Sequence, residues 1–110
     1  MKLTPEEQAW LDAYCKALEE MYPGAVQRIV IYGSKARGEA RPESDLDILL
    51  IVHNAYAHLK RELRRTGYLL AATSDALPSI LAYTEEEWDS RRESGSSFYR
   101  VVERDAVRVL

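Results

Sequence analysis

Hydrophobic residues recur along the chain with two spacings, one typical of helices and one typical of buried strands. Between Thr4 and Met21 they return every three or four residues, and Thr4 with Glu7 forms a capping box, so this segment is expected to be a helix. The runs AVQRIVIY (25–32) and LDILLIV (46–52) are short, apolar and rich in β-branched residues, which favours two buried strands.

The rest of the chain continues this alternation. A helical turn is expected from Ser34 to Gly38, followed by a polar loop over 39–44. Asn54 is a candidate cap for a helix whose inward positions are Tyr56, Leu59, Leu63 and Leu70. Beyond it the pattern predicts a strand at 77–83, a capped helix at 84–93, a helical turn within 98–105, and a last strand or tail at 106–110.

Helices and strands that alternate in this order predict an α/β (α+β) fold, in which a small mixed sheet is flanked by helices. The 110 residues are enough for one domain with one core, so residues 1–110 are interpreted as a single domain.

Composition excludes several classes of protein. A net charge of −3 does not favour an extended nucleic-acid surface, which needs many phosphate contacts. Cys15 is the only cysteine, so no internal disulfide can form, and a reducing compartment is the simplest fit. The first residues lack the apolar core of a signal peptide, and no apolar run approaches the length of about 20 residues that spans a membrane. We therefore expect a cytoplasmic protein without a membrane segment.

The candidate chemistry lies between the first two strands, in GSKARGEARPESDLDILLIV (33–52). Alternate strand residues face the same side, so Asp45 and Asp47 can share a hard cation such as magnesium. Gly33 and Ser34 begin a helical turn directly after a strand, which leaves backbone N–H groups free to bind phosphate oxygens. A side chain at position 33 would hold the phosphate away. Together these features predict a site for a magnesium nucleoside triphosphate.

This stretch resembles the signature of the minimal nucleotidyltransferases, which are small members of the DNA polymerase beta superfamily. Their pattern is Gly-Ser, then Ala-Arg-Gly, then, after a short loop, Ser-Asp-x-Asp leading into an apolar strand. The matching positions here are Gly33, Ser34, Ala36, Arg37, Gly38, Ser44, Asp45 and Asp47. The preceding helix and the third strand with its YTEEEW continuation (83–88) also resemble the family, so the resemblance covers most of the chain.

The resemblance implies a nucleotidyltransferase that transfers a nucleoside monophosphate, AMP from ATP, to a hydroxyl with release of pyrophosphate. It also implies Mg²⁺ as the cofactor and a separately encoded helical HEPN-domain protein as partner and acceptor, in a toxin–antitoxin pair. The site residues that it implies are Asp45 and Asp47 as catalytic residues and metal ligands, with Gly33, Ser34, Arg37 and Ser44 as substrate-binding residues.

One departure from the family bears on activity. The family supplies a third carboxylate from the strand after the long helix, and aligning 77–88 with that strand puts Ser79 at this position. A serine hydroxyl is a poor magnesium ligand and no base at neutral pH. Asp75 lies four residues earlier, about 13 Å away in an extended chain, and would substitute only if the chain folded back. The alternative reading is an impaired relative that binds nucleotide or the HEPN partner without turnover.

Other residues in and near the motif have plain structural readings. Arg37 is open between a salt bridge to a nearby carboxylate and a contact to the nucleotide. Gly38 is expected to end the helical turn with a positive φ angle, and Lys35 is expected on the surface.

Overall fold

The computed structural model describes residues 1–41 and 43–110. The elements follow one another along the chain as α1 (Pro5–Met21), β1 (Val26–Tyr32), α2 (Gly33–Arg37), β2 (Leu46–Val52), the 3₁₀ helix η1 (Asn54–Leu59), α3 (Lys60–Ala71), β3 (Pro78–Thr84), α4 (Glu85–Glu93), α5 (Ser97–Asp105) and β4 (Val107–Arg108). Both predicted helix caps form, and both are capping boxes: Thr4 with Glu7 begins α1, and Thr84 with Glu87 begins α4.

The four strands form one mixed sheet in the order β3-β2-β1-β4, which confirms the predicted fold class. β2 runs parallel to β3, whereas β1 is antiparallel to both β2 and β4. The segment predicted as a last strand or tail does join the sheet, as β4 beside β1. The helical turn expected within 98–105 is the nine-residue helix α5.

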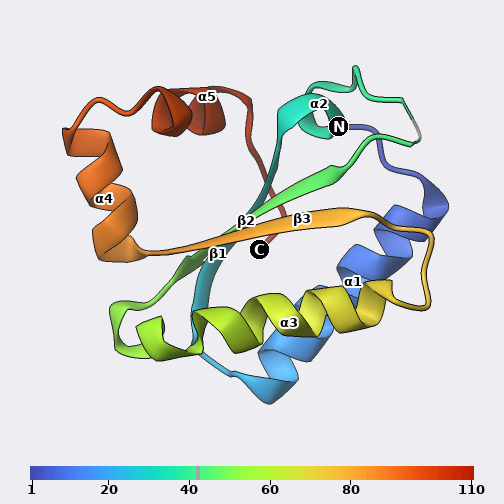
Figure 1. The fold of residues 1–110 in the computed structure, drawn as a ribbon, viewed down its shortest axis with the longest axis horizontal. Coiled ribbons are helices and arrows are strands. Elements are labelled where there is room, and N and C mark those ends of the chain that lie inside the picture. Colours follow the sequence, from blue (N-terminus) through green and yellow to red (C-terminus); the bar gives the residue numbers. More distant parts are fainter. Residues whose placement is uncertain (42) are drawn as a thin grey trace.

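Helices cover both faces of this sheet (Figure 1). α1 and α3 pack on one face, where every second residue of β2, including Ile48 and Leu50, points into the larger core. α4 and α5 pack on the other face, where Leu49 and Ile51 meet a smaller aromatic core around Trp88. The alternation assigns each residue of β2 to a face, and Asp47 shares the face of Leu49 with α4 and α5.

The larger core is closed by direct contact between α1 and α3. The Tyr14 hydroxyl donates to the Leu63 carbonyl at 2.7 Å, and the Trp10 indole N–H donates to the Gly67 carbonyl at 2.9 Å. A Cβ on Gly67 would lie 2.5 Å from Ile80 Cδ1 and 2.9 Å from Tyr14 Cζ. Glycine therefore lets α3 approach both α1 and β3 closely.

The predicted start of the long helix is wrong. Asn54 begins the 3₁₀ segment η1, the α-helix starts at Lys60, and no side chain caps either one. The Asn54 side chain instead accepts a hydrogen bond of 3.0 Å from the Glu86 N–H, in the first turn of α4. A capping side chain can bind the first turn of any helix within reach. An asparagine therefore indicated a helix cap, but not which helix it caps. The inward positions were predicted correctly, since all four contribute to the larger core: Tyr56, Leu59, Leu63 and Leu70.

β3 is an edge strand, and nearby side chains accept hydrogen bonds from backbone N–H groups on its outer side. Pro78 has no N–H, the Ile80 N–H donates to the Tyr68 hydroxyl at 2.9 Å, and the Thr84 N–H donates to Glu87 at 2.8 Å. These contacts hold the strand that carries Ser79 in place. Within the described residues, no helix is long and apolar enough to cross a membrane.

Candidate active site

The Gly-Ser turn stands where β1 ends and α2 begins. Gly33 has a φ of 77°, a conformation that favours glycine. A Cβ added there would lie 2.5 Å from Asp47 Oδ2, so the Asp47 carboxylate already fills the space beside the turn. The sequence analysis expected a glycine here to let a phosphate approach, and the structure shows the approach of a carboxylate. Gly38 ends α2 with a φ of 74°, as predicted.

Three polar side chains form a row across the sheet on the face that α4 and α5 cover. Asp47 of β2 pairs in register with Tyr32 of β1 on one side and with Ser79 of β3 on the other. Residues paired in register project from the same face of a sheet. Ser79 is therefore the residue of β3 beside Asp47, and β3 itself contains no carboxylate.

The acid pair stands at the beginning of β2. Asp45 is exposed one residue before the strand, whereas Asp47 is its second residue and is partly buried. Burial raises the pKa of Asp47, the negative charge of Asp45 raises it further, and Arg37 opposes the rise. Two carboxylates that repel each other at a partly buried site are the arrangement that a bound cation stabilises.

These two carboxylates fit a hard divalent ion that shares its coordination with substrate phosphates. Within residues 1–41 and 43–110, no group of three or more His, Cys, Asp or Glu side chains could hold a metal ion. In the part of the chain that the structure describes, the candidate donors at this position are thus Asp45 and Asp47, whereas the family pattern has three carboxylates.

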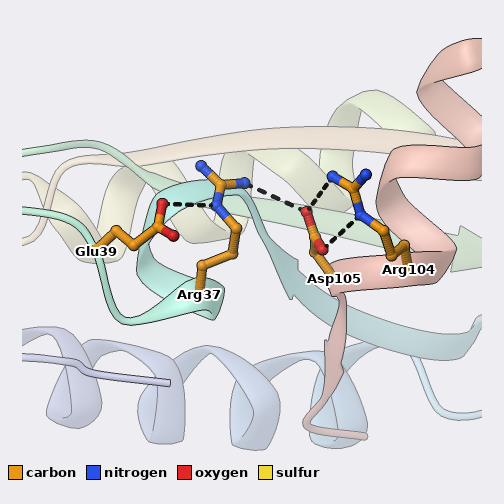
Figure 2. Close-up of polar contacts among 4 residues, drawn as sticks. All are labelled: Arg37, Glu39, Arg104 and Asp105. Carbon is orange, nitrogen blue, oxygen red and sulfur yellow. Dashed lines mark hydrogen bonds and ion pairs between the residues drawn. The ribbon is translucent and has the colours of Figure 1, made fainter.

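Arg37 of α2 lies between two carboxylates (Figure 2). Its Nε donates to Glu39 Oε2 at 3.0 Å, and its Nη1 lies 3.4 Å from Asp105 Oδ2 at the end of α5. Arg104 binds the same Asp105 through two hydrogen bonds of 2.9 and 3.1 Å. The salt-bridge reading of Arg37 is therefore realised here, although the Arg37 side chain stays 35% exposed and its charge lowers the pKa of Asp47.

The expectation for Lys35 is wrong. Its side chain is 2% exposed, and its Nζ contacts Glu7 Oε1 of α1 at 3.2 Å and the Arg41 carbonyl at 3.1 Å. A lysine inside a polar motif gives no local signal of burial, because its partner lies 28 residues away. Ser44, one residue before Asp45, is partly buried, and its N–H donates to the Arg41 carbonyl at 3.0 Å.

Asp75 does not fold back to the acid pair. It lines a surface pocket together with Glu6, Trp10 and Leu70, which belong to α1 and α3. Those helices cover the face of the sheet opposite to Asp47. On the described strand β3, Ser79 is thus the residue that pairs with Asp47.

Tyr32 was not singled out from the sequence. Burial, followed by the charge of Asp47, raises the pKa of its hydroxyl to about 12, so the group is protonated at neutral pH and can donate a hydrogen bond. In the sequence, Tyr32 is marked by its place directly before Gly33. Its position beside Asp47 follows from the register of β1 with β2, which the sequence does not give. Asp105 gave no signal, since it reaches Arg37 only through the packing of α5.

The fold thus combines a mixed sheet with a glycine turn that lies beside Asp47 of β2, while Asp45 directly precedes that strand. A family model described as "Nucleotidyltransferase domain" matches residues 11–101, and the chain belongs to this family. Domains of this family generally use a divalent metal ion.

Two individual proteins are also similar. A protein of Methanocaldococcus jannaschii that is named as a protein adenylyltransferase is 41% identical over 46 residues, which is 42% of this chain and 45% of that protein. The match thus spans less than half of the relative's length. The crystal structure of a protein from Sulfolobus solfataricus described as a nucleotidyltransferase superposes with a TM-score of 0.58 at 20% identity, covering 93% of this chain and 78% of that one. This second likeness concerns the fold.

Proposed function

We propose that this protein uses magnesium to transfer AMP from ATP to a hydroxyl group of a partner protein. The observation that carries the proposal is the contact between Asp47 and the Gly33-Ser34 turn, which we call the phosphate turn. Asp47 packs against Gly33 so closely that a Cβ there would meet its carboxylate, and Asp45 lies two residues away. A triphosphate bound at the turn would therefore reach the carboxylates. The name of the M. jannaschii relative agrees with a protein acceptor.

In this proposal the backbone N–H groups and the hydroxyl at Gly33 and Ser34 bind the terminal phosphates. Asp45 and Asp47 would hold magnesium, which when bound neutralises phosphate charge and acidifies the acceptor hydroxyl. Arg37 would exchange its contact with Asp105 for a phosphate oxygen, and Ser44 would support the turn before Asp45. The acceptor hydroxyl releases its proton to solvent and its oxygen forms a bond to the α-phosphorus. The bond from the α-phosphorus to the oxygen that bridges to the β-phosphorus breaks, and pyrophosphate leaves with that electron pair.

The proposed acceptor is a helical HEPN-domain protein encoded beside this chain, in a cytoplasmic toxin–antitoxin pair. This follows from the sequence resemblance to the minimal nucleotidyltransferases. The row Tyr32, Asp47, Ser79 supports a role for a partner, because this strand supplies a hydroxyl where the family supplies a general base. A partner that brings the hydroxyl to Asp47 can also bring the missing polar group.

The register of Asp47 with Ser79 favours a second candidate function. With two carboxylates instead of three, the chain would bind magnesium nucleotide and the partner without transferring AMP. Both candidates share the phosphate turn and the acid pair, and they differ in turnover alone.

Labelled ATP with magnesium and the co-encoded partner tests the proposal. The wild-type protein is expected to label the partner, and the double variant Asp45→Asn with Asp47→Asn is expected to abolish labelling. Asp12→Asn, an exposed acid on α1, is the matched control and should label normally. Labelling that survives the double substitution would contradict the assignment of the acid pair.

Ser79→Asp and Ser79→Ala separate the two candidates. If the wild-type protein binds magnesium ATP but transfers nothing, and Ser79→Asp alone restores transfer, the impaired reading is correct. If the wild-type protein already transfers AMP and Ser79→Ala does so equally well, the serine contributes nothing to the chemistry and the two carboxylates suffice.

A further inference from the structure

A buried ion pair connects the N-terminal helix to the candidate active site. Lys35 Nζ of α2 lies 3.2 Å from Glu7 Oε1 of α1, and the two side chains are 2% and 4% exposed. Charged side chains are almost never buried unless they are paired. Neither residue belongs to the proposed chemistry, and Glu7 precedes residues 11–101, the part of the chain that the family model matches.

Glu7 is held in one orientation by its own helix. The Thr4 N–H donates to Glu7 Oε1 at 2.9 Å, while the Glu7 N–H donates to the Thr4 hydroxyl at 3.1 Å. This capping box fixes the carboxylate at the first turn of α1. The oxygen that receives the Thr4 N–H is also the one that Lys35 contacts, so the ammonium group has a fixed anchor.

From this anchor Lys35 reaches the segment that leads to Asp45. Its Nζ donates to the Arg41 carbonyl at 3.1 Å. The same carbonyl accepts the Ser44 N–H at 3.0 Å, and Ser44 directly precedes Asp45. The Arg41 carbonyl therefore accepts both from the buried Lys35 ammonium group and from the N–H of Ser44, the residue directly before Asp45.

Net stability alone gives little reason for such a pair. Desolvation of two charges often cancels their attraction, and well-packed apolar residues can replace a buried pair without loss of stability. An apolar side chain at position 35 would, however, leave the Arg41 carbonyl without its ammonium donor. An ammonium group has several donors, which lets one side chain hold a carboxylate and a carbonyl together.

We propose that Lys35 and Glu7 are positioning residues, which hold the Arg41 carbonyl, and through it the Ser44 N–H, so that Asp45 stands beside Asp47. This inference rests on the proposed function for its ligand, magnesium nucleotide, but its structural part can be tested without any ligand. The binding of magnesium nucleotide then depends on a residue of α1 that does not touch the nucleotide.

The test uses the double variant Lys35→Met with Glu7→Gln in the full chain. The double substitution avoids leaving one buried charge alone, and glutamine keeps an acceptor for the Thr4 N–H. Lys16→Met with Glu20→Gln makes the same changes at exposed positions of α1 and is the matched control. Thermal unfolding establishes that both variants are folded before the other measurements.

The ligand-free readout is hydrogen exchange at the Ser44 amide, followed by NMR. We expect exchange at Ser44 to accelerate at least tenfold in the double variant relative to amides of β2, and to stay unchanged in the control. Ser44 protection equal to that of the wild type would overturn the inference, whether or not the protein binds nucleotide.

The second readout is the Kd of a magnesium complex of a non-hydrolysable ATP analogue, measured by calorimetry. Loss of residues that orient metal ligands typically weakens metal binding by about 10- to 100-fold, and we expect a rise in Kd within this range for the double variant. An unchanged Kd in a folded double variant would overturn the role in binding. Wild-type protein that binds no analogue would contradict the proposed function instead, while the Ser44 measurement would still decide the positioning role.

Discussion

The carboxylate of Asp47 occupies the space that a side chain at position 33 would fill. A Cβ on Gly33 would lie 2.5 Å from Asp47 Oδ2, and the φ of Gly33 is 77°. This position thus excludes a side chain for a steric reason and for a conformational one. The turn at Gly33 and the Asp47 carboxylate are consequently packed against each other, and we expect a change on either side to displace the other.

Replacing Gly33 with alanine separates these two reasons when Gly38→Ala is the control. Gly38 has a similar φ of 74°, but a Cβ there would meet no atom within 4 Å. The left-handed conformation costs a non-glycine residue roughly 1–2 kcal/mol, so both variants should lose about that much stability in denaturant unfolding. Gly33→Ala should lose more, and it alone should weaken magnesium-nucleotide binding in calorimetry. Equal effects of the two substitutions would mean that Asp47 yields without consequence.

Asp47→Asn should stabilise the protein in metal-free buffer at neutral pH. Burial and the charge of Asp45 raise the pKa of Asp47 in the folded state, so its ionised form is disfavoured by folding. The penalty is present above the folded-state pKa and disappears as the pH falls through that value toward the lower pKa of an aspartate in the unfolded chain. Unfolding in denaturant at several pH values should therefore show a stabilising difference at pH 7 that shrinks on acidification. A difference that grows on acidification would contradict this sign.

Gly67→Ala should destabilise the protein although alanine is the better helix former. Helix propensity favours alanine by about 1 kcal/mol. The added methyl group, however, would lie 2.5 Å from Ile80 Cδ1 and 2.9 Å from Tyr14 Cζ. Overpacking of a core typically costs about 1–3 kcal/mol, so we expect a net loss of stability in denaturant unfolding.

Thr66→Ala is the control for Gly67→Ala. It lies one position earlier on α3, and its hydroxyl donates to the Glu62 carbonyl of its own helix. This substitution should change stability by less than about 0.5 kcal/mol. A stabilising effect of Gly67→Ala would show that α3 can move away from Tyr14 and Ile80 without loss.

Asn54→Ala should loosen the start of α4. The Asn54 side chain accepts the Glu86 N–H at 3.0 Å, and removal of a capping side chain costs about 1 kcal/mol. Hydrogen exchange should accelerate at the Glu86 amide and leave the amides of α3 unchanged, while Asn54→Asp keeps the acceptor and should behave like the wild type. Faster exchange in α3 instead would restore the assignment that the sequence pattern favoured.

Much of the fold could be predicted because its signals are local. The periodic apolar positions of α1, the two capping boxes and the β-branched runs of β1 and β2 depend on neighbours within a few residues. The start of α3 was misplaced because a 3₁₀ segment precedes it and Asn54 serves another helix. The sequence did not decide between a strand and a tail for the last segment, because the two residues of β4 are too few to show a strand pattern.

The sequence by itself determined the family of this protein, its main elements and its candidate groups at Gly33, Ser34, Asp45 and Asp47, because these are encoded by spacing within short segments. Only the tertiary structure decided the partners of three other residues. Lys35 reaches a glutamate 28 residues away, Arg37 reaches an aspartate 68 residues away, and Asp75 lies against the helices on the far face of the sheet. Such contacts depend on how packed helices and paired strands bring distant segments together, which no local pattern specifies.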